Sequence, residues 1–147
     1  VADLGCGNGV LGLALAKRNP STHISFFDES YMAIETAKRN WVSNGLSLDR
    51  ADFKVSDCLS MYDSDPFDLI VCNPPFHEGR SIAHHVAWRM FSQSKLHLSQ
   101  EGRFMVVGNR HLDHHLRLAR LFGHCQVTGT DGKFVVLTAR VSAEKQG

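Results

Sequence analysis

The chain has 147 residues, of which 43% are hydrophobic and 21% charged, a composition typical of one globular domain. Sixteen Lys and Arg residues against fifteen Asp and Glu leave a net charge of +1, which argues against nucleic-acid binding through bulk positive charge. No window holds the roughly 20 apolar residues that cross a bilayer, and the four scattered cysteines form no C-x-x-C pair, so we expect a cytoplasmic protein without a zinc site or disulfide framework.

Strands and helices alternate in the first part of the chain. Residues 1–4 read as the end of a buried strand, and apolar residues without a breaker predict a helix over 10–18. A β-prone run predicts a strand over 23–27. A serine that can cap a first turn then predicts a helix over 30–41, and a third strand is expected over 52–56.

The same alternation continues to the C-terminal region. An apolar run predicts a fourth strand over 67–72, followed by a helix over 82–98, a fifth strand over 103–108 and a helix over 112–122. The inward-facing residues expected on this last helix are Leu112, Leu116, Leu118, Ala119, Leu121 and Phe122. Two final strands, at about 125–130 and 134–141, flank the hairpin dipeptide Asp131-Gly132.

This order of elements predicts an α/β fold. The sheet should be doubly wound, seven-stranded and mostly parallel, with an antiparallel hairpin at its C-terminal end. The abrupt start inside a strand predicts a fragment of a longer protein with a truncated N-terminus, and residues 142–147 form a polar tail.

Several unusual residues fall where the predicted parallel strands end, which is where doubly wound sheets bind ligands. Gly5, Gly7 and Gly9 follow the first strand, and the helix after them points free N–H groups toward a ligand. Asp28 ends the second strand and suits a ribose diol, although an acid here can simply cap a helix. Asp57 follows the third strand and suits an adenine amino group, although a solvated loop acid is the plainer interpretation.

The residues around the glycines argue against a phosphate-bearing cofactor. Gly5, Gly7 and Gly9 stand at alternate positions, and no Lys-Ser/Thr pair follows them. Asp3, just before the glycines, would repel a pyrophosphate. A carboxylate there favours a cationic ligand such as the amino group of S-adenosylmethionine.

Asn73-Pro74-Pro75-Phe76, after the fourth strand, carries the strongest chemical signal. Two prolines fix the backbone and remove donors, which leaves the Pro74 carbonyl and the Asn73 side-chain oxygen as acceptors. Two acceptors that hold both hydrogens of an exocyclic amino group favour a pyramidal nitrogen with an available lone pair. Phe76 offers a ring face for a flipped base, so the turn predicts methylation of an amino nitrogen.

These motifs resemble the class I S-adenosylmethionine-dependent methyltransferases, whose fold is Rossmann-like. Residues 73–77, 86–91, 109–113 and 133–137 further resemble the bacterial ribosomal RNA guanine-N2 methyltransferases, and the large-subunit group more than the small-subunit group. The resemblance implies transfer of a methyl group to the exocyclic N2 of a guanine in large-subunit (23S) rRNA. It also implies a catalytic domain over 1–141 and an N-terminal domain, absent from this chain, that binds the RNA.

The resemblance assigns roles to particular residues. Catalytic roles are expected for Asn73, Pro74, Pro75 and Phe76. Contacts with S-adenosylmethionine are expected for Asp3, Gly5, Cys6, Gly7, Asn8, Gly9, Asp28, Glu29, Asp57, Cys58 and Asn73. His77 and Arg110 are candidate substrate contacts, and no metal is expected.

The remaining conspicuous residues have plainer interpretations. Five histidines are expected to be exposed helix residues rather than metal ligands: His84, His85, His111, His114 and His115. The helix residues Trp41 and Trp88 are expected to pack on the sheet. Arg117 and Arg120 suit either a backbone phosphate or a solvated helix face.

Three other functions remain open from the residues alone. The first is methylation of another amino nitrogen, in small-subunit rRNA, DNA adenine or a protein glutamine. The second is a cofactor-binding module without catalysis, which the intact Asn-Pro-Pro-Phe turn argues against. The third is a nicotinamide dehydrogenase, which the absence of a placed acid for hydride transfer argues against.

Overall fold

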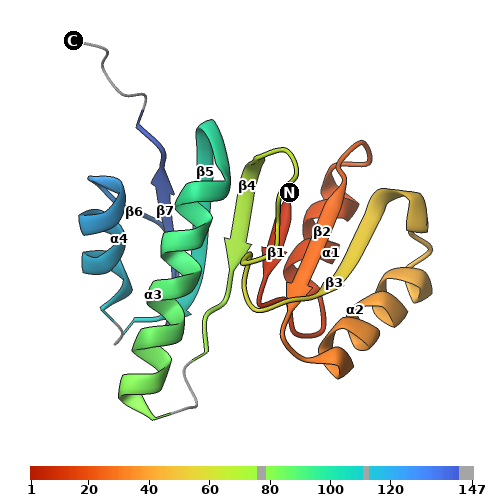
Figure 1. The fold of residues 1–147 in the computed structure, drawn as a ribbon, viewed down its shortest axis with the longest axis horizontal. Coiled ribbons are helices and arrows are strands. Elements are labelled where there is room, and N and C mark those ends of the chain that lie inside the picture. Colours follow the sequence, from red (N-terminus) through yellow and green to blue (C-terminus); the bar gives the residue numbers. More distant parts are fainter. Residues whose placement is uncertain (76–78, 111–112, 143–147) are drawn as a thin grey trace. The chain divides into compact units, whose positions relative to one another are not determined.

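The computed structural model describes residues 1–75, 79–110 and 113–142, and the chain divides into two compact units, Val1–Asp63 and Ser64–Gly147 (Figure 1). The expected polar tail at 143–147 lies outside the described residues. Within the described part of the chain, no helix combines the length and apolar character that crossing a membrane requires.

The first unit is a three-stranded parallel sheet with its helices. Its elements are β1 (Ala2–Leu4), α1 (Val10–Arg18), β2 (Ile24–Asp28), α2 (Tyr31–Ser43), a short 3-10 helix (Leu48–Arg50) and β3 (Ala51–Val55). The strand order is β3-β2-β1. The predicted strands are all present, with ends shifted by about one residue.

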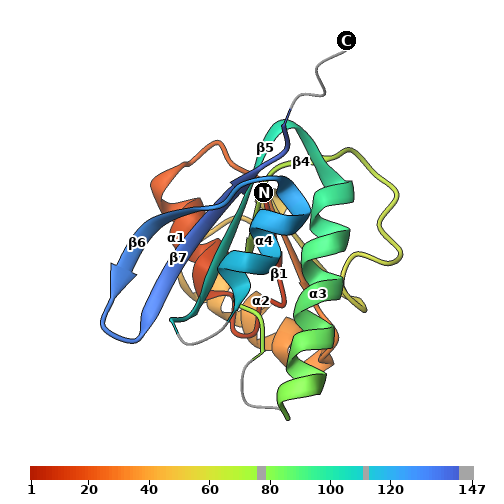
Figure 2. The same ribbon diagram turned by 90° about the vertical axis from the view of Figure 1, so that its left-hand side faces the viewer.

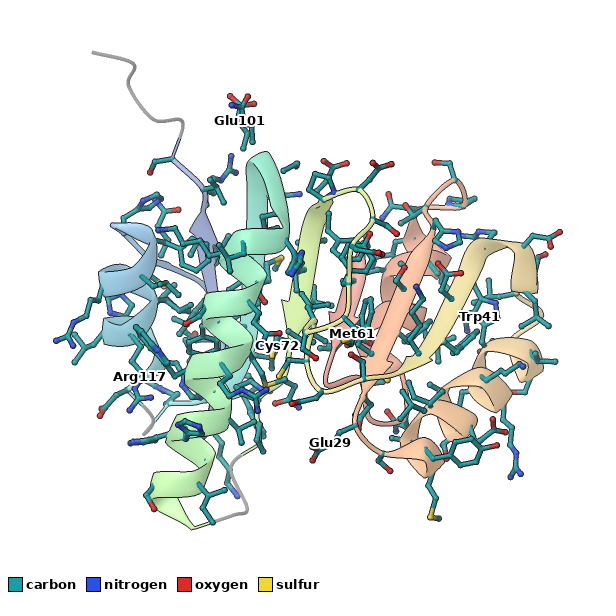
Figure 3. The ribbon with its side chains drawn as sticks, viewed as in Figure 1. Glu29, Trp41, Met61, Cys72, Glu101 and Arg117 are labelled. Carbon is teal, nitrogen blue, oxygen red and sulfur yellow. The ribbon has the colours of Figure 1, made fainter. Side chains whose placement is uncertain are left out.

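Phe26 of β2 organises the core on the face that α1 and α2 cover. Its ring stacks on Phe53 at 5.0 Å between centroids and meets Trp41 edge-on at 5.7 Å. Trp41 (Figure 3) is fully buried, as predicted. Its indole N–H donates to the Ser47 carbonyl at 2.9 Å. A Cβ on Gly12 would lie only 2.4 Å from the Phe26 ring, so the close approach of α1 to β2 requires a glycine there.

The second unit combines four strands and two helices. Its elements are β4 (Phe67–Cys72), α3 (Arg80–His97), β5 (Leu98–Asn109), α4 (His114–Phe122), β6 (Gln126–Asp131) and β7 (Phe134–Arg140). The order is β4-β5-β7-β6, in which β4 and β5 are parallel and β7 is antiparallel to both of its neighbours. Helices α3 and α4 lie on the same side of β5 and β7 (Figure 2), where Phe91 and Phe122 contact Phe104.

The predicted fold class is confirmed: seven strands, mostly parallel, end in an antiparallel hairpin. Two details differ. Strand β5 starts five residues earlier than predicted and includes a tight turn, in which Glu101 takes φ 63° and a Cβ on Gly102 would lie 2.8 Å from the Ser99 carbonyl. The two residues between β6 and β7 are Gly132 and Lys133, because Asp131 is still paired in the sheet.

The buried face of helix α4 differs from the face that the sequence predicts. It begins at His114, and its buried residues His114, Leu118 and Phe122 are spaced four apart on one face. Leu116 is two residues from both His114 and Leu118 in the chain, so its side chain points away from their face of the helix. It is 68% exposed, and its predicted burial is wrong. The predicted packing of Trp88 is also wrong, since 38% of its surface is exposed. Leu112 and His111 lie outside the described residues.

His114 was expected to be exposed and is buried, with 4% of its surface accessible. Its ring meets Phe91 edge-on at 5.3 Å and fits against β5 where Gly108 has no side chain. Its Nε2 has no hydrogen-bond partner among the described residues. The pKa of His114 is lowered to about 4, chiefly because the ring is buried; the nearby Arg117 and His84 contribute to this shift, and the charge of Asp113 opposes it.

This environment makes stability fall in acid. Because the folded-state pKa is below the ordinary 6.5, the unfolded chain takes up the proton first as pH falls from 6.5 toward 4. We expect His114→Phe to remove about 1–2 kcal/mol of the stability that is lost between pH 7 and pH 5. Urea unfolding at both pH values measures this, with the exposed neighbour variant His115→Phe as control. Identical pH dependence in wild type and His114→Phe would contradict the assignment.

Candidate functional site

The glycine loop between β1 and α1 is left-handed at three positions. The φ angles are 65° at Gly5, 52° at Gly7 and 82° at Gly9. A Cβ on Gly9 would meet Ala37 at 3.0 Å, so this glycine permits close packing of α2, whereas a Cβ on Gly7 would meet nothing within 4 Å. The loop is therefore packed at Gly9 and leaves open space at Gly7, as a ligand cradle requires.

Asp3 lies beneath this loop and supports the start of α1. The N-cap residue Gly9 has no side chain, and the Asp3 carboxylate instead accepts the Gly12 N–H at 2.9 Å. Only 1% of Asp3 is exposed. The pKa of Asp3 is raised to about 7, chiefly because the carboxyl is buried; the hydrogen bond from Gly12 opposes this rise, and the charge of Asp28 adds to it.

Asp28 joins the end of β2 to the glycine loop. One carboxylate oxygen accepts the Gly7 N–H at 2.9 Å and the other accepts the Ser30 N–H at 2.9 Å. The cap of α2 is Ser30, whose hydroxyl accepts the Ala33 N–H, so Asp28 is not the helix cap. A carboxylate offers about four lone-pair sites, so Asp28 retains capacity for a ligand diol.

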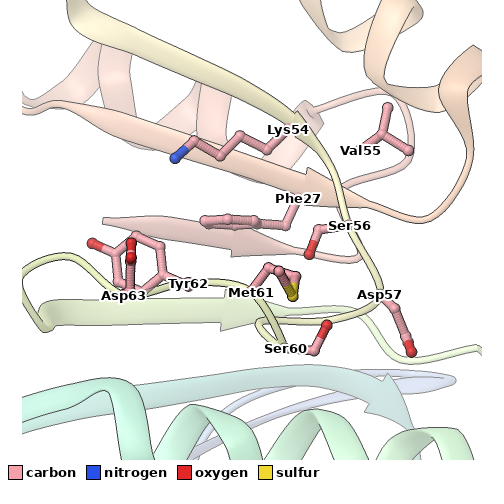
Figure 4. A pocket seen from close by; sticks show the side chains of 9 residues that line it. All are labelled: Phe27, Lys54, Val55, Ser56, Asp57, Ser60, Met61, Tyr62 and Asp63. Carbon is pink, nitrogen blue, oxygen red and sulfur yellow. The ribbon is translucent and has the colours of Figure 1, made fainter.

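A cavity of about 280 Å³ opens beside Asp57 (Figure 4). Its lining residues are Phe27, Lys54, Val55, Ser56, Asp57, Ser60, Met61, Tyr62 and Asp63. The Phe27 and Tyr62 rings meet edge-on at 5.8 Å, and the Ser56 N–H donates to the Asp28 carbonyl at 2.8 Å. The volume is below that of most whole-ligand pockets and suits one ring system.

The remaining predicted cofactor residues divide into three kinds. Cys6 lies in the core and is only 7% exposed. Burial raises the pKa of its thiol, and the charges of Asp3 and Asp28 raise it as well. The thiol therefore stays neutral and packs as a small apolar group. Cys58 takes φ 51°, and its carbonyl accepts the Ser56 hydroxyl at 2.7 Å. Glu29 is exposed beside the start of α2 (Figure 3).

Two supporting residues were missed from the sequence. Asn40 of α2 donates its side-chain N–H to the Asn8 carbonyl at 2.9 Å and so holds the glycine loop. No local pattern signals this contact, because 32 residues separate the partners. Gly12 allows the close approach of α1 to β2, and its spacing three residues after Gly9 was a readable signal.

In the second unit, the predicted catalytic turn begins where β4 ends. Asn73 is exposed, Pro74 is buried and Pro75 is half-buried, while Phe76 and His77 lie outside the described residues. The strand end is fixed by pairing of Cys72 with Val106 of β5. The exposed Asn73 side chain and the fixed Pro74 backbone are consistent with two acceptors presented at this edge.

Arg110 follows β5 at the same edge and is exposed. Arg117 is less available for a substrate, because its guanidinium donates to the His84 carbonyl at 3.0 Å. In the described ranges, no three His, Cys, Asp or Glu side chains come together as a set that could hold a metal ion.

Comparison with curated proteins gives close relatives. The chain is 49% identical over 140 residues to ribosomal RNA large subunit methyltransferase G of Shewanella amazonensis, and 46% identical over 140 residues to that of Pseudoalteromonas translucida. Each match covers 95% of this chain and 37% of the relative. The chain therefore spans just over a third of the length of these relatives.

Solved structures share the fold. The T. thermophilus 16S rRNA N2 methyltransferase RsmC, solved with AdoMet and guanosine, superposes with a TM-score of 0.80 at 27% identity, over 95% of this chain and 36% of that one. A ribosomal protein L11 methylase from Lactobacillus delbrueckii has a TM-score of 0.74 at 21% identity, over 97% of this chain and 69% of its own. The methyltransferase small domain model matches residues 1–138, so the chain belongs to that methyltransferase family.

Proposed function

We propose that this chain is the catalytic part of an S-adenosylmethionine-dependent enzyme that methylates the exocyclic N2 of a guanine in large-subunit (23S) rRNA. The observation that carries the proposal is the 46–49% identity, across 95% of the chain, to relatives named ribosomal RNA large subunit methyltransferase G. The fit of the residues to that chemistry supports it independently.

The first unit offers the contacts that this cofactor needs. Bound S-adenosylmethionine supplies an electrophilic methyl group on a positively charged sulfur. The open space at Gly7 admits the ligand next to the backbone, and the remaining lone pairs of Asp28 accept the ribose hydroxyls. Asp3 supplies negative charge toward the amino group, and Asp57, at the cavity of ring size, accepts the adenine amino group.

The second unit offers the contacts that the acceptor needs. The Asn73 side-chain oxygen and the Pro74 carbonyl accept the two hydrogens of the guanine amino group, which leaves the nitrogen lone pair available for the methyl carbon. With the cofactor bound, methyl transfer would form the new N–C bond as the C–S bond of the donor breaks, and the surplus proton of the amine would leave to water. Phe76 and His77 remain proposed contacts for the extruded base.

The partner is ribosomal RNA. Because the chain has a net charge of +1 and spans 37% of its curated relatives, we assign most of the RNA affinity to an N-terminal domain of the complete protein. A ribosomal substrate also implies action in the cytoplasm.

The decisive experiment is methyl transfer from labelled S-adenosylmethionine by the natural full-length protein. The substrate is rRNA from a strain that lacks the enzyme, and the product is identified by nucleoside analysis. The proposal requires labelled N2-methylguanosine in the large-subunit RNA. Label in small-subunit RNA, in adenine or in protein would assign the enzyme to another amino nitrogen, and tight NAD binding without methyl transfer would exclude the methyltransferase activity.

Asp3 makes cofactor binding depend on pH. With a pKa of about 7, its ionised fraction rises roughly 15-fold from pH 5.5 to pH 7, where the cofactor amino group is still mostly protonated. We expect affinity for S-adenosylmethionine to rise roughly tenfold over this range, as measured by calorimetry. Asp3→Asn keeps an acceptor for Gly12 and should remove most of the rise.

Ionisation of Asp3, which favours cofactor binding, lowers the stability of the fold. Its folded-state pKa is above the ordinary 3.8, so its neutral form favours folding, and stability falls as pH rises from about 4 through 7. An Asp3→Asn variant that keeps the full pH dependence of cofactor affinity would remove Asp3 from the ligand contacts.

A further inference from the structure

The tip of the β6–β7 hairpin is bonded to the segment that leaves β5. The Arg110 N–H donates to the Lys133 carbonyl at 3.0 Å, and the Arg110 guanidinium approaches the Gly132 carbonyl at 3.4 Å. Asn109 pairs with Phe134 at the same level of the sheet. Arg110 is therefore held beside Lys133 and Phe134, although more than 20 residues separate it from them in the chain.

This cluster lies at the edge of the sheet where the proposed catalytic turn begins. Cys72, the residue before Asn73, pairs with Val106, so Asn109 lies three residues, or about 10 Å, farther along β5. Strand β7 is the second neighbour of β4, about 10 Å across the sheet. The hairpin tip is thus within reach of a nucleotide adjacent to one whose base lies at Asn73.

The exposed chemistry of the tip suits a single-stranded RNA segment. Phe134 is 40% exposed, and Lys133 and Arg110 are exposed beside it. Aromatic faces stack on unpaired bases, and Lys and Arg side chains bind the adjoining phosphates. One acid, Asp131, is also exposed at the turn, so the three residues and Asp131 together carry a net charge of +1.

We propose that Phe134, Lys133 and Arg110 form a subsite for the nucleotide next to the target guanine, with Phe134 stacked on its base and the two cations on its phosphates. The inference rests on the proposed function. It identifies the substrate at this point as single-stranded or opened RNA, because a base paired in a duplex offers no free face to Phe134.

The test is single-turnover methyl transfer by the natural full-length protein to unmodified rRNA. Phe134→Ala should raise the RNA concentration for half-maximal rate about fivefold or more, because one stacked base is lost, while the rate at saturation stays within twofold. Phe134→Tyr keeps the ring and should stay within twofold in both quantities. Phe134→Leu keeps the apolar bulk and should behave like Phe134→Ala, which separates stacking from support of the fold.

Lys133→Gln tests the phosphate contact. The slope of log affinity against log salt should become smaller by about one unit, whereas Lys38→Gln, an exposed lysine on α2, should leave it unchanged. Wild-type behaviour of both the Phe134 and Lys133 variants, or a fall in the saturated rate with unchanged half-saturation, would overturn the subsite. Failure of wild type to methylate the RNA would instead overturn the proposed function.

Discussion

Asn73→Ala should lower the single-turnover rate of methyl transfer by a factor on the order of 10²–10³, the usual cost of removing one oriented transition-state hydrogen bond. The side chain is exposed at the end of β4, so its loss leaves no cavity. Its proposed task is to hold one amino hydrogen of guanine. Affinity for S-adenosylmethionine should stay largely intact, because the Asp28 and Gly7 contacts lie in the first unit.

Asn73→Asp is the matched control for this variant. A carboxylate retains an acceptor of nearly the same shape, so Asn73→Asp should be faster than Asn73→Ala. Calorimetry on each variant separates loss of cofactor binding from loss of chemistry. If Asn73→Ala turned over at nearly the wild-type rate, the Asn-Pro-Pro-Phe turn would only terminate a strand, and the catalytic site would have to be sought elsewhere.

The sequence predicted the order of elements because each one has a strong local signal. The alternating apolar runs, Ser30 as a cap and the two prolines after β4 all depend on neighbouring residues. The errors come from longer-range packing. The His114 ring packs against β5 at Gly108, where there is no side chain. A polar residue of α4 is therefore buried, whereas Leu116 is exposed. No periodicity rule contains that information.

For the candidate site too, the sequence contained the local signals but not the long-range contacts. Its glycines and acids stand at strand ends, which the pattern locates, but their partners are distant in the chain. The bond from Gly7 to Asp28 spans 21 residues, and the bond from Gly12 gives Asp3 a second task as the cap of α1. The sequence thus predicted which residues contact a ligand, and it did not indicate how those residues hold one another.

Asp28→Ala should weaken binding of S-adenosylmethionine by roughly 1.5–3 kcal/mol, or about 10- to 150-fold in Kd. The proposed loss is that of charge-assisted hydrogen bonds to the ribose diol. The structure adds a second cause, because the same carboxylate accepts the Gly7 N–H and holds the glycine loop at the end of β2. The measured effect therefore combines ligand contacts with loop order.

Two further variants separate these causes. Asp28→Asn keeps one acceptor oxygen, which can serve Gly7 or the diol but lacks the charge, so its affinity should fall between wild type and Asp28→Ala. Asn40→Ala removes only the bond to the Asn8 carbonyl and so loosens the loop without touching the ribose contacts. If Asn40→Ala matched Asp28→Ala in Kd, loop order would account for the whole loss. If Asp28→Ala bound like wild type, Asp28 would have no part in the cofactor site.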